Sequence, residues 1–207
     1  MSLFIKLCGL RTTADVESAV DAGANAVGFV MTESPRQVSV AQAARLRSLL
    51  PAEVLAVAVL NDPSPGLVQR TSAEVAPDLF QVELQKVSGL PLDRILPVVV
   101  DGDGLEDAVA RALNATQTGM VLVDSAAKGG TGNRSDWDRL ATLETRDRVV
   151  VAGGLDPGNV GDAISRIQPF GVDVSSGIER QLGEKDPELM RAFVKAARAA
   201  EMRGARL

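Results

Sequence analysis

Short apolar segments recur along the chain at fairly regular intervals, and most of them lack the alternating polar positions of a strand with one exposed face. They are rich in Val, Ile and Leu, which is typical of parallel strands covered on both faces. We therefore predict eight strands: Phe4–Cys8, Ala26–Met31, Val54–Leu60, Leu79–Glu83, Ile95–Val100, Met120–Val123, Val149–Ala152 and Val172–Val174.

The segments between these strands have helical periodicity, and several carry residues that favour a helix start. A side-chain cap three residues before an acidic residue indicates a capping box, and an aspartate before a proline indicates an N-cap followed by the first helical position. The predicted starts are Thr12 with Asp15, Ser39 ahead of the apolar Ala43, Leu46, Leu49 and Leu50, Asp156 before Pro157, and Asp186 before Pro187.

Repeated strand and helix, without hairpin signals, predicts a parallel sheet, and eight such units close a barrel. The fold class expected is therefore α/β, a single (β/α)8 TIM barrel domain spanning residues 1–207. The fourth helix should be shortened or missing, because the connection 84–94 contains Gly89 and Pro91.

Composition restricts the partners. The 22 Lys and Arg against 27 Asp and Glu give a net charge of −5, which argues against broad contacts with nucleic acid or an anionic membrane surface. With one cysteine and no histidine, neither a disulfide within the chain nor a metal site is expected. Because no apolar run approaches the ~18 residues that span a bilayer, we expect a cytoplasmic protein.

In such barrels the active site lies at the carboxyl ends of the strands, and three of these ends are followed by turns rich in Gly or Ser. Small residues let backbone N–H groups approach phosphate oxygens, and a helix starting at Asp156 or just after Gly177 would add its positive end. The alternative is that these glycines only close tight turns. The predicted phosphate turns are Gly129-Gly130-Thr131-Gly132, Gly153-Gly154 and Ser175-Ser176-Gly177.

Three further side chains follow strands at the same end. Cys8 is either a small buried apolar residue or a base at the barrel mouth, where Lys6 would favour its thiolate over the usual thiol pKa of ~8.5. Asp124 is either a turn cap or a carboxylic acid opposite Cys8, and such a pair can move a proton between neighbouring atoms. Arg36 is either a surface arginine or a bidentate ligand for a carboxylate.

At these residues the chain resembles the phosphoribosylanthranilate isomerase family of tryptophan biosynthesis, with matching motifs in order from one end to the other. Each motif alone is modest, but together they are highly specific. The matching segments are Lys6-Leu7-Cys8-Gly9-Leu10, 22–30, Ser34-Pro35-Arg36, Gly129-Gly130-Thr131-Gly132 with Asp136-Trp137, 152–160, 172–179 and 183–187.

The resemblance implies an Amadori rearrangement of N-(5'-phosphoribosyl)anthranilate without a cofactor or metal, in a monomer or homodimer. It implies that Cys8 is the general base and Asp124 the general acid. The substrate, a small phosphorylated and carboxylated molecule, would be bound by Arg36 at its carboxylate and by the phosphate turns. The binding residues so implied are Arg36, Gln81, Gly130, Thr131, Gly132, Gly153, Gly154, Ser175, Ser176 and Gly177.

One region departs from the family pattern. After the fourth strand the family usually has Gln-Leu-His-Gly, a full helix, and a fifth strand that carries a lysine. This chain has Gln81-Val82-Glu83-Leu84, a shortened connection, and Leu96-Pro97-Val98. Glu83 then stands at the barrel mouth, where it would repel an anionic substrate or reshape the pocket beyond the sugar.

Two other functions are compatible with these residues. One is a divergent paralogue that isomerises a different phosphoribosyl amine, which the altered fourth-strand region favours. The other is a non-catalytic barrel that binds a phosphosugar. Retention of both Cys8 and Asp124 argues against the second, since binding alone requires neither.

Overall fold

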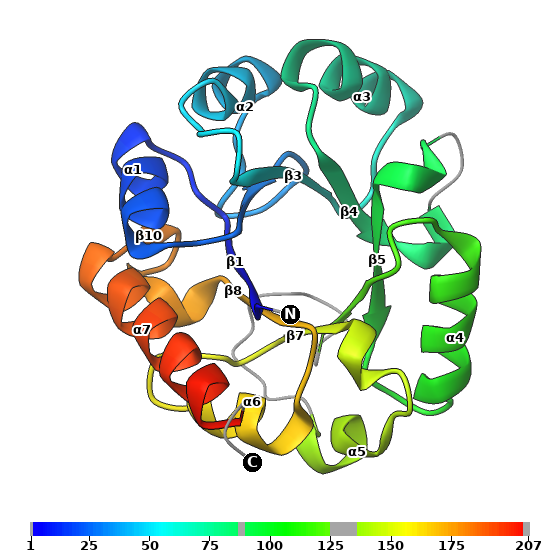
Figure 1. The fold of residues 1–207 in the computed structure, drawn as a ribbon. Coiled ribbons are helices and arrows are strands. Elements are labelled where there is room, and N and C mark those ends of the chain that lie inside the picture. The colour runs from blue at the N-terminus through cyan, green and yellow to red at the C-terminus, as the bar shows by residue number, and fades with distance from the viewer. Residues whose placement is uncertain (1, 87–89, 125–135, 205–207) are drawn as a thin grey trace.

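The computed structural model describes residues 2–86, 90–124 and 136–204, and in it eight parallel strands close into a barrel. Each strand pairs with its neighbours in chain order, and β1 closes the ring by pairing with β8, Lys6 opposite Asp173. Figure 1 views the barrel down its axis, with the helices forming the outer ring. The strands are β1 Phe4–Cys8, β2 Ala26–Val30, β3 Leu55–Leu60, β4 Leu79–Glu83, β5 Ile95–Val100, β6 Val121–Asp124, β7 Val149–Ala152 and β8 Gly171–Val174.

All eight predicted strands are present, with small shifts at their ends. Met31, Val54 and Met120 lie just outside their strands, whereas Gly171 and Asp124 are included. Asp124 belongs to β6 because it continues the ladder to β7, opposite Ala152. The (β/α)8 barrel is thereby confirmed.

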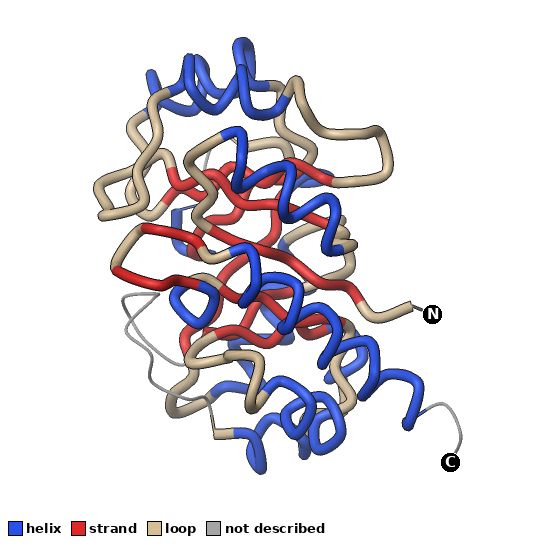
Figure 2. Tube along the Cα trace, turned by 90° about the vertical axis from the view of Figure 1, so that its left-hand side faces the viewer, coloured by secondary structure: helices blue, strands red, loops and turns tan. Residues whose placement is uncertain are grey.

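Helices follow most strands and run back along the outside of the barrel, as the side view in Figure 2 shows. A two-stranded hairpin, β9 Glu179–Gln181 with β10 Glu184–Lys185, stands between β8 and the last helix. None of the helices in the described ranges is both long and apolar enough to cross a membrane. The helices are α1 Thr13–Ala22, α2 Val40–Arg47, α3 Pro65–Arg70 with a π turn Thr71–Val75, α4 Leu105–Ala115, α5 Trp137–Thr142, α6 Val160–Ile167 and α7 Pro187–Gly204.

Three of the predicted helix starts are correct. Thr12 and Asp15 form a reciprocal capping box, and Ser39 caps α2 by accepting a hydrogen bond from the Gln42 amide. Asp186 accepts bonds from the first amides of α7. The apolar stripe predicted after Ser39 is too long, because α2 ends at Arg47 and Leu49 is 44% exposed.

The predicted helix start at Asp156 is wrong. Its carboxylate accepts a hydrogen bond from the Gly158 amide two residues on, so it stabilises a turn and does not cap a helix. Asn159, at the N-cap of α6, fixes that turn by donating to the Gly154 carbonyl and accepting from the Asp156 amide. The helix predicted after Gly177 is a single 3-10 turn, Ser176–Ile178.

The shortened fourth unit is confirmed for the residues that are described. Between β4 and β5 they form 3-10 turns at Leu84–Lys86 and Leu92–Arg94. A third such turn, Arg146–Arg148, precedes β7.

Alternate residues of each strand face two separate cores. One set packs between the strands and the helices, and includes Ile5, Leu7, Val27 and Phe29. The other set fills the inside of the barrel. Its apolar members are Phe4, Cys8, Ala26, Val30, Val57, Val59, Leu79, Leu96, Leu122, Val150 and Ala152.

Candidate active site

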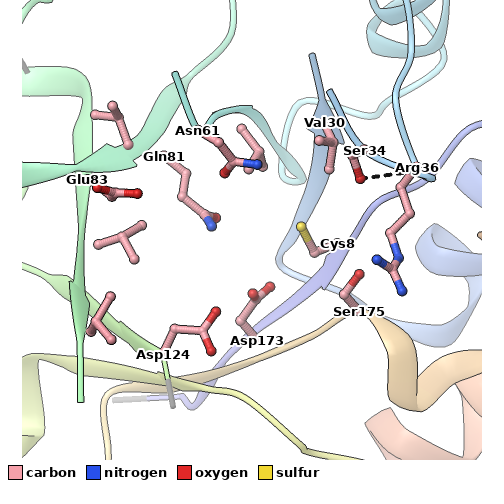
Figure 3. A pocket seen from close by; sticks show the side chains of 14 residues that line it. Cys8, Val30, Ser34, Arg36, Asn61, Gln81, Glu83, Asp124, Asp173 and Ser175 are labelled. Carbon is pink, nitrogen blue, oxygen red and sulfur yellow. Dashed lines mark hydrogen bonds between the residues drawn. The ribbon is translucent and has the colours of Figure 1, made fainter. Parts of the chain in front are cut away.

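A cavity opens among the carboxyl ends of the strands, at the end where the sequence places the site. Its lining includes five residues for which the sequence predicts a role and the acidic residue that departs from the family pattern. The five are Cys8, Arg36, Gln81, Asp124 and Ser175, and the acidic residue is Glu83. Figure 3 shows their side chains around one space, with the Cys8 sulfur directed into it. The other lining residues are Val30, Ser34, Val59, Asn61, Val82, Val98, Val100 and Asp173.

Cys8 stands above a buried ion pair inside the barrel. Lys6, which is two residues earlier on β1 and fully buried, donates to Asp173 of β8 over 2.8 Å. Gly28 on β2 leaves room for both side chains of β1. A Cβ at that position would lie 2.7 Å from the Cys8 Sγ and 3.2 Å from the Lys6 Nζ. The Lys6 side chain thus lies inside the barrel.

Lys6 does not, however, make Cys8 a low-pKa thiol as expected. Burial raises the pKa of the Cys8 thiol, and although Lys6 lowers it, Asp173 raises it again, so the net shift is upward from the ordinary value. The same surroundings raise the pKa of Lys6, where Asp173 and Cys8 outweigh the effect of burial. Cys8 is therefore a protonated thiol at neutral pH before a ligand binds.

The Lys6 and Asp173 pair can be tested through the Cys8 pKa. Because Lys6 lowers that pKa more than Asp173 raises it, the double variant Lys6→Met, Asp173→Asn is expected to raise it further. Changing both leaves no unpaired buried charge. With a single cysteine and no tyrosine, thiolate absorbance near ~240 nm reports only Cys8. A lower pKa in the double variant would contradict the assignment.

The matched control is the exposed pair of Arg166 and Asp138, whose atoms lie 3.3 Å apart on the outside of the barrel. Arg166→Met with Asp138→Asn makes the same chemical change far from the thiol. We expect the Cys8 titration of this control to match that of the unchanged protein.

Asp124 ends β6 and projects into the cavity from the side of β6 and β5, while Cys8 projects from β1 (Figure 3). Its backbone carbonyl accepts a hydrogen bond from the Asp101 amide at 2.8 Å, which ties the end of β6 to the loop after β5. A thiol and a carboxyl group on different strands of one cavity can remove and donate protons at neighbouring atoms of a bound molecule.

Arg36 lies beside Ser175 at the edge of the cavity, with 7% of its side chain exposed. Its Nε and Nη2 donate to the two carboxylate oxygens of Glu179, at 2.6 and 2.8 Å. The Nε and Nη2 edge of the guanidinium, which could bind a substrate carboxylate in a bidentate way, is thus occupied by Glu179. The Nη1 side is left to bind a ligand. Ser34 accepts a bond from the Arg36 amide and stiffens the loop.

The two phosphate turns that the structure describes lie against each other. Gly153 and Gly154 have φ of 89° and 63°, a region that favours glycine. A Cβ on Gly177 would lie only 1.9 Å from the Leu155 carbonyl oxygen, so the loops after β7 and β8 touch through their backbones. Ser175 lines the cavity, whereas Gly129, Gly130, Thr131 and Gly132 lie outside the described residues.

The opposite wall, from β3 and β4, is polar. Gln81 is 9% exposed, and among the described residues its Oε1 is buried without a hydrogen-bond partner. A buried amide oxygen in this state favours a ligand that donates to it. Glu83 stands next to it on β4, 3.6 Å from the Lys86 ammonium, so the acidic residue expected at the mouth is there.

Sequence reasoning assigned no role to several residues of this site. Asp173 could have been found, because it lies on β8 two residues before Ser175 and so faces the same side. Asn61 follows β3 at the same end of the barrel. Glu179 and Lys185 carry no such signal, since only the folding of the β9–β10 hairpin brings them to Arg36 and Ser175.

Among the residues described, no group of three His, Cys, Asp or Glu side chains is arranged to hold a metal ion. The chemistry that the geometry supports is removal of a proton from a bound molecule by one of the two groups, the thiol or the carboxyl, and donation of a proton to it by the other. An anionic group would be held at the Arg36 and Ser175 edge.

Comparison with known proteins gives consistent similarities. The family model described as N-(5'phosphoribosyl)anthranilate (PRA) isomerase matches residues 5–196. An N-(5'-phosphoribosyl)anthranilate isomerase of Listeria monocytogenes serotype 4a (strain HCC23) is 35% identical over 204 residues, covering 96% of this chain and all of that protein.

Two solved structures are similar over 96% of this chain and 100% of theirs. One shows mutually generated monomers of the dimeric phosphoribosylanthranilate isomerase from Thermotoga maritima, with 31% identity and a TM-score of 0.78. The other shows a phosphoribosyl anthranilate isomerase in complex with reduced 1-(o-carboxyphenylamino)-1-deoxyribulose 5-phosphate, with 32% identity and a TM-score of 0.75.

Proposed function

Since the chain belongs to the N-(5'-phosphoribosyl)anthranilate isomerase family, we propose that it converts N-(5'-phosphoribosyl)anthranilate to 1-(2-carboxyphenylamino)-1-deoxyribulose 5-phosphate in tryptophan biosynthesis. The observation that carries the proposal is the placement of Cys8 and Asp124 on different strands of one cavity, beside Arg36 and Ser175. The substrate is an aldose derivative and the product a ketose derivative of the same composition.

The proposed reaction begins with opening of the sugar. Asp124 donates a proton to the furanose ring oxygen, the bond from that oxygen to C1' breaks, and the nitrogen lone pair forms the C1' Schiff base. Cys8 then removes the C2' proton, and the electron pair moves through C1' to the nitrogen to give an enolamine. Tautomerisation to the C2' ketone completes the rearrangement. In this last step C1' gains a proton and the C2' hydroxyl loses one. Because C1' is reduced as C2' is oxidised, the reaction consumes no external oxidant or reductant.

The raised pKa of Cys8 bears on the base step. Only the thiolate accepts the proton, so ionisation of Cys8 should make kcat/KM rise with pH as long as the general acid keeps its proton. Lys6 below the sulfur and Lys185 nearby both stabilise the thiolate form. They oppose the effect of burial and so limit the rise in the pKa of Cys8.

The phosphate and the carboxylate of the substrate are proposed to be bound by different residues. The turns at Gly153-Gly154 and Ser175-Ser176-Gly177, together with Gly130, Thr131 and Gly132, bind the phosphate through backbone amides. The Nη1 side of Arg36 binds the carboxylate, and the Gln81 amide accepts a hydrogen bond from the substrate. The reduced product bound to a relative carries both a phosphate and a carboxylate group, in keeping with a site that binds both.

The direct test is turnover in vitro, followed by loss of the fluorescence of phosphoribosylanthranilate. Growth of a bacterial strain that lacks this isomerase, on medium without tryptophan, tests the same activity in cells. Turnover only of another phosphoribosyl amine would favour the divergent paralogue. Binding of phosphosugars without any turnover would favour the non-catalytic barrel.

Glu83 is expected to weaken binding of this anionic substrate. It lines the cavity and is only partly neutralised by Lys86 at 3.6 Å. Removing the charge with Glu83→Gln should lower KM about threefold at low salt, since partly exposed charges interact by less than ~1 kcal/mol, and the gain should shrink as salt is added. Glu17→Gln, on the exposed face of α1, controls for net charge. An unchanged or higher KM for Glu83→Gln would contradict this role.

We further propose a cytoplasmic location and a monomer or homodimer. The first is in keeping with the proposed pathway of small soluble metabolites. The second is supported by the relative from Thermotoga maritima, which is described as dimeric and also as monomers generated from it.

A further inference from the structure

The β9–β10 hairpin connects directly to Arg36, although the two are far apart in the chain. Glu179, at the start of β9, accepts both hydrogen bonds of the Arg36 fork, and its Oε1 also accepts from Lys185 at 2.8 Å. Lys185 in turn donates to the Ser175 carbonyl at 2.9 Å. One carboxylate therefore joins the arginine, the hairpin and the end of β8.

This cluster is buried. The exposed fractions are 4% for the Glu179 side chain, 7% for Arg36 and 0% for Lys185. One carboxylate between two basic groups leaves a net charge of +1 when both are protonated. A buried cluster with that charge, at the edge of the cavity, favours an anion.

Besides the hydrogen bond that the Gly183 amide donates to the Glu179 Oε2 at 3.1 Å, the hairpin makes contacts that do not involve Glu179. Gly183, at its turn, has a φ of 78°, and a Cβ there would lie 2.9 Å from the Pro35 carbonyl oxygen. Arg11 donates to the carbonyls of both Pro35 and Gly183, each at 3.2 Å. The hairpin and the loop that carries Arg36 are thus also packed together by contacts outside the charged cluster.

We propose that Glu179 is a positioning residue for recognition of the substrate carboxylate, acting through Arg36. By occupying Nε and Nη2, it fixes the plane of the guanidinium and directs the Nη1 side toward the cavity. A side chain ordered in advance loses less conformational entropy when the ligand binds. The inference rests on the proposed function, because it names the group by which that substrate is recognised.

The acidity of Glu179 suits this role. Burial alone would raise its pKa, but hydrogen bonds from Arg36 and Lys185 lower it from 4.5 to about 2. Glu179 is therefore anionic throughout the pH range in which an enzyme of this kind is assayed, and its hydrogen bonds with Arg36 are not lost there through its own protonation.

The experiment compares two ligands that differ only in the carboxylate. These are 1-(2-carboxyphenylamino)-1-deoxyribulose 5-phosphate and 1-phenylamino-1-deoxyribulose 5-phosphate, and calorimetry measures the Kd of each. In Glu179→Gln we expect the preference for the carboxylated ligand to fall roughly tenfold, as charge-assisted hydrogen bonds of ~1.5 kcal/mol or more imply. Binding of the ligand without the carboxylate should not change. Glu184→Gln, in the same hairpin but bonded to Gln181, is the matched control.

A double-mutant cycle shows whether Glu179 acts through Arg36. In an Arg36→Met background, Glu179→Gln should cause no further loss of preference. Should Glu179→Gln fail to fold, Glu179→Asp keeps the charge, cannot reach both nitrogens, and should give an intermediate loss.

The outcomes are distinct. An equal loss for both ligands would mean a purely structural residue and would overturn the proposal, as would additive effects in the cycle. If the unchanged protein bound neither ligand, the proposed function itself would fail. If it bound both equally, only the carboxylate recognition would fail.

Discussion

Replacing Cys8 by Ser, or Asp124 by Asn, is expected to lower kcat/KM by ~10²–10⁴, the usual cost of losing a positioned base or acid. A serine hydroxyl is too weak an acid to be ionised near neutral pH, and an asparagine amide cannot donate a proton to the ring oxygen. Both changes preserve shape, so KM should move much less than kcat. Fluorescence decay of phosphoribosylanthranilate gives both constants.

The two variants also differ in what remains possible. With Asp124→Asn, opening of the furanose ring becomes the slow step, so little Schiff base forms from the bound substrate. With Cys8→Ser the ring opens but C2' keeps its proton, and exchange of that hydrogen with deuterated water should stop. Asp103→Asn, an exposed residue in the loop before α4, is the control for loss of a carboxylate at the same end of the barrel. Activity close to normal in either site variant would require another base or acid.

Much of this fold could be predicted because every strand packs against a core on each face and is therefore apolar along its length. A strand covered on both faces is apolar throughout, as in Val149–Ala152, and eight such runs separated by helical segments leave few arrangements other than a barrel. The boundaries were less certain because they depend on pairing. Asp124 belongs to a strand through its ladders to β5 and β7, which its polarity gave no reason to expect.

The start of α6 shows a second limit. Asp156 followed by Pro157 has the composition of a helix start, yet the Asp156 carboxylate bonds to Gly158, and the helix begins three residues after Pro157. The turn is decided by Asn159, whose side chain bridges Gly154 and Asp156. An aspartate followed by a proline is equally compatible with a helix N-cap and with a turn. Contacts with the loop after β7 favour the turn here.

Site residues that lie at the ends of strands could be predicted from the sequence. Residues that only tertiary contacts bring to the site could not. Cys8, Gln81 and Asp124 come to one cavity because strand ends meet at one end of the barrel. The partner of Arg36 could not be predicted, since Glu179 lies 143 positions away along the chain. The pKa of Cys8 is raised although Lys6 lowers it as expected, because burial has the larger effect, and the depth of burial is not visible in the sequence.

Gly177→Ala is expected to have the largest effect on stability. An added Cβ would lie 1.9 Å from the Leu155 carbonyl oxygen and 3.0 Å from the Asp156 Cα, and these are backbone atoms that cannot rotate away. The loops after β7 and β8 must then separate. We expect unfolding free energy to fall by ~3 kcal/mol, the upper range for overpacking, as measured by urea denaturation.

The same change should weaken phosphate binding, because the amides of both loops form the proposed phosphate site and their spacing depends on this contact. Inorganic phosphate should therefore stabilise Gly177→Ala against heat less than it stabilises the unchanged protein. Gly66→Ala is the matched control: a Cβ at Gly66 in α3 meets no atom within 4 Å, and alanine favours a helix by ~1 kcal/mol over glycine. Equal phosphate stabilisation in Gly177→Ala and Gly66→Ala would mean that the two loops do not form the phosphate site together, whatever the loss of stability.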